Sequence, residues 1–267
     1  MKKVLAKSYV FIILILLYAP LLLLFVFSFN SSLTIGSWTG GVTFELYRNL
    51  FTGRYASQIG EALTNTLIIS VASSLLSVVL GTLAAIGIQY MRPKAKSLLN
   101  TLSRIPLMNA EIVSALCFML FFSLIHLQTG YLTVILAHTT FCTPYVLLNV
   151  QPKLQQMNKH TYEAAVDLGA TPLQAMRKVV LPEIMPGIIS GGILAFTVSI
   201  DDFVITQFTI GEFETLATFI YNTAGGKKPL PPELRALSVL IFVTVLLILF
   251  AVNRFSAKAQ RAKEATA

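Results

Sequence analysis

Long runs of apolar residues constrain this chain more than any other feature. Only 12% of its 267 residues are Asp, Glu, Lys or Arg, while 55% are hydrophobic. A soluble domain carries about 25% charged residues, and a helix needs about 20 apolar residues to cross a membrane. We therefore predict an all-α integral membrane protein with six transmembrane helices. The six segments are 8–29, 63–90, 105–126, 131–150, 186–208 and 236–254.

The basic residues predict the direction of these spans. If both termini are cytoplasmic, fifteen of the twenty Lys and Arg residues lie on the cytoplasmic side and five on the outer side. Such an excess of Lys and Arg is typical of cytoplasmic loops. The first apolar segment is longer than the core of a usual signal peptide, so we interpret it as the first span.

Small residues form a stripe along the second predicted span. They recur every four residues, which places them on one face of a helix. Small side chains at that spacing let helix backbones approach closely, so we expect this face to be buried against other transmembrane helices. The stripe consists of Ser73, Ser77, Gly81 and Ala85.

The longest polar segment, residues 151–185, lies between the fourth and fifth predicted spans on the cytoplasmic side. Glu163, Ala164 and Ala165 favour a helix. Gly169 suits the left-handed position that closes it. We expect a short helix that projects from the membrane as a docking surface.

A second short helix is expected directly after that turn. Thr171 is a good N-cap, and Pro172 fits the first helical position. Pro182 is expected to limit this helix, because proline interrupts helical hydrogen bonding. The two helices would lie at an angle to each other.

The same loop resembles the signature of binding-protein-dependent ABC importer permeases. That signature reads Glu-Ala-Ala, three residues, Gly, nine residues, an aliphatic residue, one residue, and Leu-Pro. The chain matches it in full, with Val in place of the common Ile. The matching residues are Glu163, Ala164, Ala165, Gly169, Val179, Leu181 and Pro182.

The resemblance implies a type I ABC importer permease (MetI-like) fold, in which residues 1–267 form a single permease domain of a bacterial inner membrane. The first short helix would be the coupling helix, where Glu163 contacts a separate ATPase and Gly169 provides the turn. The implied partners are an ABC ATPase dimer, a second permease and a substrate-binding protein. The chain itself would hold no catalytic residue, metal or cofactor, with ATP and Mg bound by the ATPase. In agreement, the P-loop pattern GxxxxGK[ST] is absent from the sequence.

Three acidic residues, Glu111, Asp201 and Asp202, lie at or inside predicted spans. Because a charge in hydrocarbon is costly, such residues normally face a polar cavity or a partner. We expect Glu111 about six residues into the third span and Asp201 about fifteen residues into the fifth, so that acids line a cation pathway near both ends. Alternatively, Glu111 caps the start of its helix. Asp201 and Asp202 could instead pair with an Arg of a partner subunit or lie at the outer boundary.

Several segments resemble the polyamine (spermidine/putrescine) branch of these permeases. This resemblance implies polyamine cargo, bound through ion pairs and cation–π contacts. Trp38 and Tyr221 are candidate contacts on the outer face, with interfacial anchoring as the alternative. The branch usually has Pro-Asp where this chain has Ala110-Glu111. The similar segments are 29–32, 65–67, 196–208, 215–216, 220–221 and 232–233.

Other functions stay open at this point. The same class of permease could carry ferric iron, thiamine or an anion, although acids within the spans argue against an anion. An ATP-independent secondary transporter would use Asp201 and Glu111 as ion sites. A membrane enzyme would need a catalytic constellation, and none is apparent. The histidines show no metal-ligand spacing and are assigned no role; they are His126, His138 and His160.

Overall fold

The computed structural model describes residues 2–30, 32, 41–225, 231–244, 246–247 and 254. No strand occurs among these residues, which confirms the predicted all-α class for this part of the chain. The chain divides into two compact units. One unit is Glu61–Phe219, and the other combines Met1–Gly60 with Ile220–Ala267. The expected contact Trp38 lies outside the described residues.

The unit formed by the two ends of the chain contains α1 (Lys2–Phe27), α2 (Glu45–Thr52) and a helical segment at 233–244. Ser28 follows α1 and donates a hydrogen bond to the carbonyl of Phe25. Its hydroxyl also lies 2.8 Å from that of Tyr47 on α2. An apolar cavity of about 120 Å³ lies between α1 and the helical segment.

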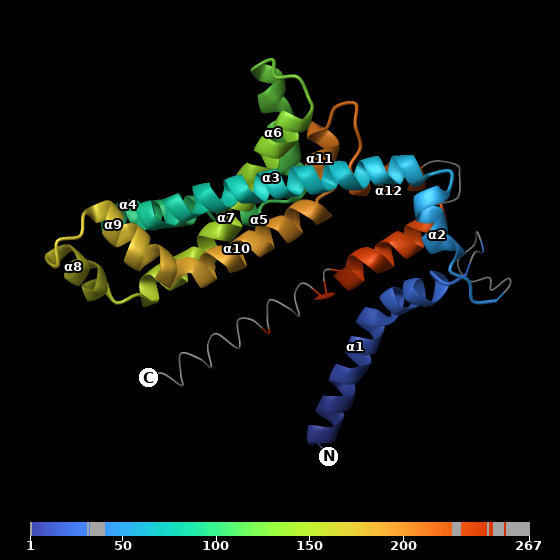
Figure 1. The fold of residues 1–267 in the computed structure, drawn as a ribbon, viewed down its shortest axis with the longest axis horizontal. Helices are drawn as coiled ribbons and strands as arrows, with labels where there is room; N and C mark the ends of the chain where they lie inside the picture. Colours follow the sequence, from blue (N-terminus) through green and yellow to red (C-terminus); the bar gives the residue numbers. More distant parts are fainter. Residues whose placement is uncertain are drawn as a thin grey trace. The chain divides into compact units, whose positions relative to one another are not determined.

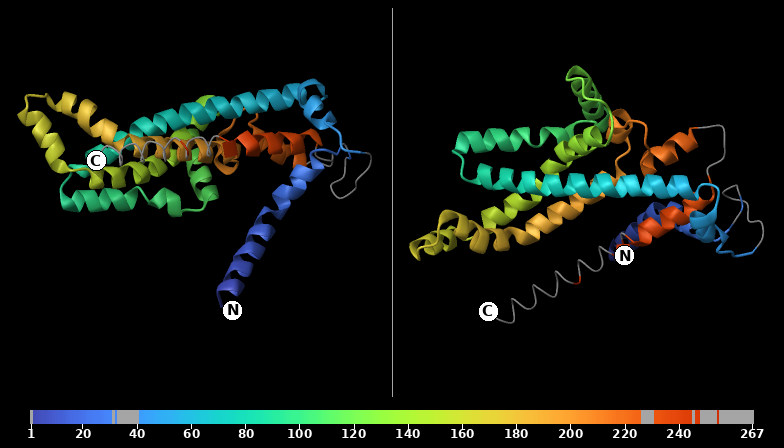
Figure 2. Two further views of the ribbon diagram at one scale, coloured as in Figure 1. Left: turned by 60° about the horizontal axis from the view of Figure 1, so that its bottom comes forward. Right: turned by 45° about the horizontal axis from the view of Figure 1, so that its top comes forward.

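The central unit holds the long helices that carry the predicted sites. The views in Figures 1 and 2 place α8 and α9 at one end of α7 and α10, and α11 at the other end. Helices α3 and α12 cross the boundaries between the two units. The helices are α3 (Ala56–Gln89), α4 (Pro93–Leu102), α5 (Ile105–Met108), α6 (Glu111–Leu124), α7 (Tyr131–Gln156), α8 (Lys159–Asp167), α9 (Pro172–Ala175), α10 (Leu181–Asp201), α11 (Val204–Thr209) and α12 (Leu216–Ala224).

The described residues do not confirm six spans. Three helices are long and apolar enough to cross a membrane: Ala56–Gln89, Tyr131–Gln156 and Pro172–Asp201. A fourth is obtained if Pro93–Met108 and Glu111–Leu124, which meet at 103°, count as one bent span. The apolar part of α1 that can be assessed is shorter, and much of the predicted sixth span lies outside the described residues.

The prediction of a continuous third span at 105–126 is wrong. The chain leaves the helical conformation at Asn109 (φ −75°, ψ 150°) and Ala110 (φ −63°, ψ 132°). Two successive extended residues cannot continue an α-helix, and Asn favours helix ends because its side chain competes for backbone hydrogen bonds. The long apolar helix therefore begins only at Glu111.

The predicted limit at Pro182 is wrong, and the fifth predicted span, 186–208, has different bounds. One helical path runs from Pro172 to Asp201. Proline lacks an N–H and crowds the carbonyl four residues earlier. A π-helical turn, Met176–Val180, precedes Pro182, and the Leu181 N–H bonds to the carbonyl of Met176. This wider turn lets the helix pass the proline, and the break comes instead after Asp201.

Close packing between α7 and α10 forms much of the core. A Cβ atom built on Gly187 would lie 2.8 Å from the carbonyl oxygen of Asn149, and one on Gly191 would lie 2.9 Å from the Cα of Val146. These distances are too short for a side chain, so glycine is required for the backbones to come this close. Val146 and Val150 are fully buried at this contact.

The small-residue stripe of α3 lies in the same core, as predicted. Ser73, Ser77 and Ala85 are fully buried. The Ser77 hydroxyl donates to the carbonyl of Thr139 on α7 at 3.1 Å. A Cβ atom on Gly81 would lie 2.7 Å from that of Val146. The stripe is thus the surface by which α3 packs against α7.

We predict that Gly81→Ala destabilises the protein, because the added methyl group must displace Val146. Overpacking of this kind costs about 1–3 kcal/mol. Gly87→Ala, also on α3, is the matched control, since its Cβ atom meets nothing within 4 Å. Thermal unfolding of the detergent-purified protein should show a lower Tm for Gly81→Ala only. Equal Tm values for the two variants would contradict the packing described here.

Candidate functional site

Helix α8 presents the first part of the loop signature. Asn158 caps its start, accepting a hydrogen bond from the His160 N–H at 3.0 Å. The Glu163 side chain is 66% exposed, and its carboxylate lies 3.2 Å from Nδ1 of His160. Ala164 is exposed and Ala165 is half-buried. The carboxylate is therefore available to a partner.

Gly169 closes α8 as predicted. Its φ of +88° is in the left-handed region, which a side chain disfavours. Its N–H bonds to the carbonyl of Val166, and the N–H of Ala170 bonds to the carbonyl of Ala165. These two bonds form a Schellman motif, which satisfies the last carbonyls of the helix and reverses the chain.

The next helix begins as predicted at Thr171. The Thr171 hydroxyl accepts from the Gln174 N–H at 3.4 Å, and the Gln174 side chain accepts from the Thr171 N–H at 3.0 Å. This is a capping box, with Pro172 in the first turn. Both ends of the turn between α8 and α9 are thus held by local hydrogen bonds.

Two leucines at this turn face outward. Leu168 is 89% exposed and Leu173 is 69% exposed, so both apolar side chains are open to a partner at this turn. On the inner side, Tyr162 and Leu181 pack against the buried core. The signature therefore has one face anchored in the protein and one face free for a partner. Pro182 is exposed.

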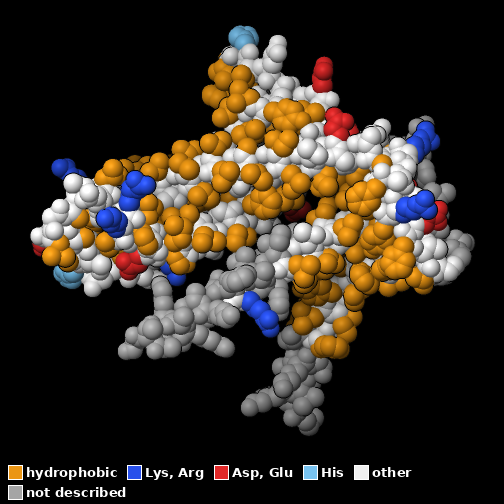
Figure 3. All heavy atoms as spheres, viewed as in Figure 1, with side chains coloured by type: hydrophobic (Ala, Val, Ile, Leu, Met, Phe, Trp, Pro, Cys, Tyr) orange, Lys and Arg blue, Asp and Glu red, His pale blue; other side chains and the backbone are white. Residues whose placement is uncertain are grey.

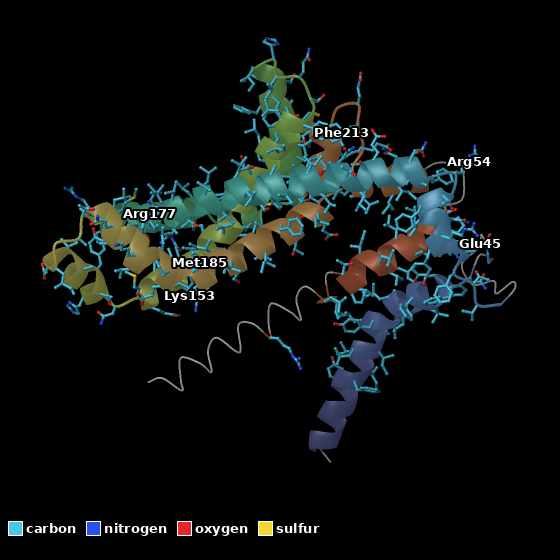
Figure 4. All side chains as sticks on the ribbon, in the orientation of Figure 1. Glu45, Arg54, Lys153, Arg177, Met185 and Phe213 are labelled. Atoms are coloured by element: carbon cyan, nitrogen blue, oxygen red, sulfur yellow. The ribbon has the colours of Figure 1, made fainter. Side chains whose placement is uncertain are left out.

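Charged side chains surround this turn. Figure 3 shows hydrophobic side chains along much of the long helices, with Lys and Arg, together with some Asp and Glu, at the end that carries α8 and α9. Figure 4 labels Arg177 and Lys153 at that end and Phe213 near α11 at the other.

The two adjacent acids of the predicted pathway lie in different environments. Asp201 is the last residue of α10 and is exposed. The Asp202 side chain is only 3% exposed. Its carboxylate accepts hydrogen bonds from the N–H (2.8 Å) and hydroxyl (2.9 Å) of Thr206, in the first turn of α11. Asp202 therefore fills the break between the two helices, and only Asp201 is presented at the surface.

His138 on α7 completes the environment of Asp202, although the sequence analysis assigned it no role. Its side chain is 2% exposed, and Nε2 lies 3.3 Å from Oδ2 of Asp202. Nδ1 lies 2.7 Å from the hydroxyl of Ser199, which lies 3.0 Å from that of Ser73. The available signal was an ionisable residue well inside an apolar span, because such residues pair with a partner within the protein.

A polar stripe extends along α10 from its first turn to Asp201. Its members are exposed and are separated by seven, seven and four residues, which places them on one side of the helix. Ser190 donates to the side-chain oxygen of Asn149 on α7 at 3.1 Å. Polar groups on a spanning helix face a partner or an aqueous cavity rather than lipid. The stripe consists of Glu183, Ser190, Thr197 and Asp201.

The structure places Glu111 at the start of α6, not six residues into a span. It is exposed in the first turn, where a carboxylate interacts favourably with the helix dipole. This is the position that the capping alternative predicts. A cavity of about 160 Å³ adjoins the bend before it, between Asn109, Cys117 and Thr140. Tyr221 is exposed on α12, in the other unit.

Two of the segments that carry the sequence resemblance meet near α11. The Asn65 side chain donates to the carbonyl of Glu214, and the Thr66 hydroxyl accepts from the Leu216 N–H, each at 2.8 Å. The Phe213 ring stacks on Tyr131, with centroids 3.9 Å apart. These contacts fix the segment after α11 against α3 and α7.

Comparison with known proteins supports the same class of molecule. Residues 77–262 match the family described as "Binding-protein-dependent transport system inner membrane component". The chain is 35% identical to the putrescine transport system permease protein PotI of Escherichia coli, over 92% of this chain and 88% of PotI. It is 32% identical to the spermidine/putrescine transport system permease protein PotC of the same organism, over 88% and 87%. PotC of Haemophilus influenzae is 30% identical, over 90% and 91%.

Solved structures share the fold at low sequence identity. A bacterial importer of the acidic polysaccharide alginate has a chain with a TM-score of 0.69 at 19% identity, covering 96% of this chain and 95% of that one. The inward-facing methionine ABC transporter MetNI has a chain with a TM-score of 0.61 at 20% identity, covering 75% of this chain and 95% of that one. These likenesses show an all-helical membrane permease fold.

We predict that Gly169→Val loosens the turn after α8, because a β-branched residue in the left-handed region is strained by about 1–2 kcal/mol. Gly169→Asn is the matched control, since Asn tolerates this conformation. Hydrogen–deuterium exchange of the peptide covering α8 and the turn should be faster in Gly169→Val and near wild type in Gly169→Asn. Unchanged exchange in Gly169→Val would show that the turn does not depend on glycine.

Proposed function

The chain belongs to the family of binding-protein-dependent transport system inner membrane components, and from that premise we propose that it carries polyamines through half of a translocation pathway. It is the permease subunit of an ABC importer and not an ATPase. Its relatives among putrescine and spermidine/putrescine permeases support this cargo. The observation that carries the proposal is one helical path, Pro172–Asp201, which joins the exposed turn after α8 to the exposed acid.

The turn after α8 is the proposed docking surface for the ATPase. Glu163 offers an exposed carboxylate, and Leu168 and Leu173 offer apolar anchors beside it. Interfaces gain most of their affinity from a few such residues at a well-packed centre. Because Leu181 is packed in the core, movement of the turn is passed to α10.

The exposed stripe of α10 is the proposed pathway face. Its carboxylates, Asp201 and Glu183, suit a cargo with several ammonium groups, and its hydroxyls suit hydrogen bonding between them. The chain has a net charge of +8, so the protein as a whole repels a cation. Local acidic side chains are therefore needed to attract a cationic cargo. Glu111 is a further candidate for this pathway, and Asp202 supports it from the buried side. Tyr221, in the other unit, is proposed separately as a residue that contacts the cargo.

The remaining features of the importer follow from the family. We propose six spans with both termini in the cytoplasm, in line with the distribution of Lys and Arg. A second permease would supply the other half of the pathway. An ABC ATPase dimer would bind ATP and Mg, and a substrate-binding protein would deliver the polyamine from outside.

The docking surface is tested by Glu163→Ala and Leu168→Asp. We predict that each lowers ATP-dependent uptake by about tenfold or more, as expected for central interface residues. Each should also reduce co-purification of the ATPase at equal membrane expression. His160→Ala is the control, because it removes the neighbour of Glu163 but keeps the carboxylate. Normal uptake by Glu163→Ala would rule out the proposed contact at that residue.

The cargo is tested by uptake of labelled spermidine and putrescine into a polyamine-import-deficient bacterium that carries the whole operon. We predict that Asp201→Asn raises KM by about two- to fivefold, the effect of losing an exposed charge pair, while Asp201→Glu stays near wild type. Absence of polyamine uptake by the wild-type protein would refute the cargo. Competition with thiamine and ferric iron in the same assay would then identify the alternative.

A further inference from the structure

His138 contacts the buried Asp202 through one ring nitrogen. Nε2 lies 3.3 Å from Oδ2 of Asp202 and 2.9 Å from Oγ1 of Thr206. The Thr206 hydroxyl also donates to the same carboxylate at 2.9 Å. The imidazole, the hydroxyl and the carboxylate therefore form one buried cluster.

The other ring nitrogen connects His138 to two further helices. Nδ1 lies 2.7 Å from the hydroxyl of Ser199 on α10, which lies 3.0 Å from the hydroxyl of Ser73 on α3. Ser73 in turn donates to the carbonyl of Ile69 at 2.7 Å. Both ring nitrogens of His138 therefore have partners within the protein, which hold the ring in one orientation.

This pair lies where α10 stops and α11 begins. Asp202 adopts an extended conformation (ψ 123°) immediately after the last residue of α10. Its carboxylate bonds both to α11, through Thr206, and to α7, through His138. These bonds fix the backbone at Asp202. Because Asp201 directly precedes it, they also determine the direction in which the Asp201 side chain points.

We propose that His138 is a positioning residue, which holds the Asp202 side chain inward through its imidazole so that Asp201 alone is presented on the pathway face. The proposal rests on the function proposed above, because it gives Asp201 its role toward a cationic cargo. Two adjacent aspartates would thus have different roles: Asp202 binds within the protein, and Asp201 faces the cargo. Cys142 also lies close to Asp202, and its thiol donates to the carbonyl of Ala195.

A double-mutant cycle tests this role. His138→Gln leaves the buried Asp202 carboxylate without its imidazole partner, so we expect uptake to fall about tenfold or more. Adding Asp202→Asn removes the stranded charge, so the double variant should recover to the level of Asp202→Asn alone. A side chain that merely filled space would give additive losses. Additive losses, with no recovery in the double variant, would overturn the proposal.

Thiol labelling tests the position of residue 201 without reference to cargo. Asp201→Cys and Thr197→Cys are made in a background with Cys117→Ala and Cys142→Ser, and the assembled complex is treated in membranes with a water-soluble methanethiosulfonate. We expect His138→Gln to slow labelling at 201 severalfold, the double variant to restore it, and labelling at 197 to stay constant. Unchanged labelling at 201, or equal slowing at both positions, would overturn the local role of His138.

The two readouts separate this proposal from the function on which it rests. If the wild-type complex imports no polyamine, the cargo is refuted, while labelling still decides whether His138 controls residue 201. If polyamine is imported but the labelling rate at position 201 is the same with and without His138→Gln, the cargo is supported and the positioning role is refuted.

Discussion

Every backbone N–H and C=O at membrane depth must find a hydrogen-bond partner within the protein, and this constraint governs where the helices stop. A break in a spanning helix exposes such groups, so side chains must replace the lost bonds. At the end of α10 the Asp202 carboxylate accepts from the amide of Thr206 and restarts the helical path as α11. At the bend before α6, the Val113 N–H bonds to the carbonyl of Ala110. A side-chain acceptor thus bridges the break at Asp202, whereas backbone groups alone make this bond at the bend before α6.

The lipid surroundings also explain why the core is built from small and polar residues. Lipid offers apolar helices as good an environment as their neighbours do, so association relies on close contact and hydrogen bonds. Gly187 and Gly191 allow α10 to lie against α7, and Ser77 and Gly81 do the same for α3. Helix α7 is consequently the common neighbour of the other two, and His138 projects from it into their shared interior.

Local signals in the sequence predicted local structure well. The all-α class, the stripe of α3, the left-handed Gly169 and the cap at Thr171 each depend on residues close in the chain, and the structure confirms them. Continuity of helices was harder to predict. The bend before Glu111 lies within an apolar run, so hydropathy does not reveal it. Pro182 suggests the end of a helix, but the π turn before it allows the helix to continue. The contrast between Asp201 and Asp202 depends on α7, some sixty residues away, so composition could not reveal it.

The π turn at Met176–Val180 has a consequence for the geometry of the whole path. Such a turn holds one residue more than an α-helical turn, and one residue corresponds to about 100° of rotation about the axis. It therefore sets the angular phase between Thr171, at the start of the path, and Asp201, at its end. A chain one residue shorter in this segment could keep every side chain of both sites and still point the acid into the core. The length of this turn is thus as much a part of the site as the residues themselves.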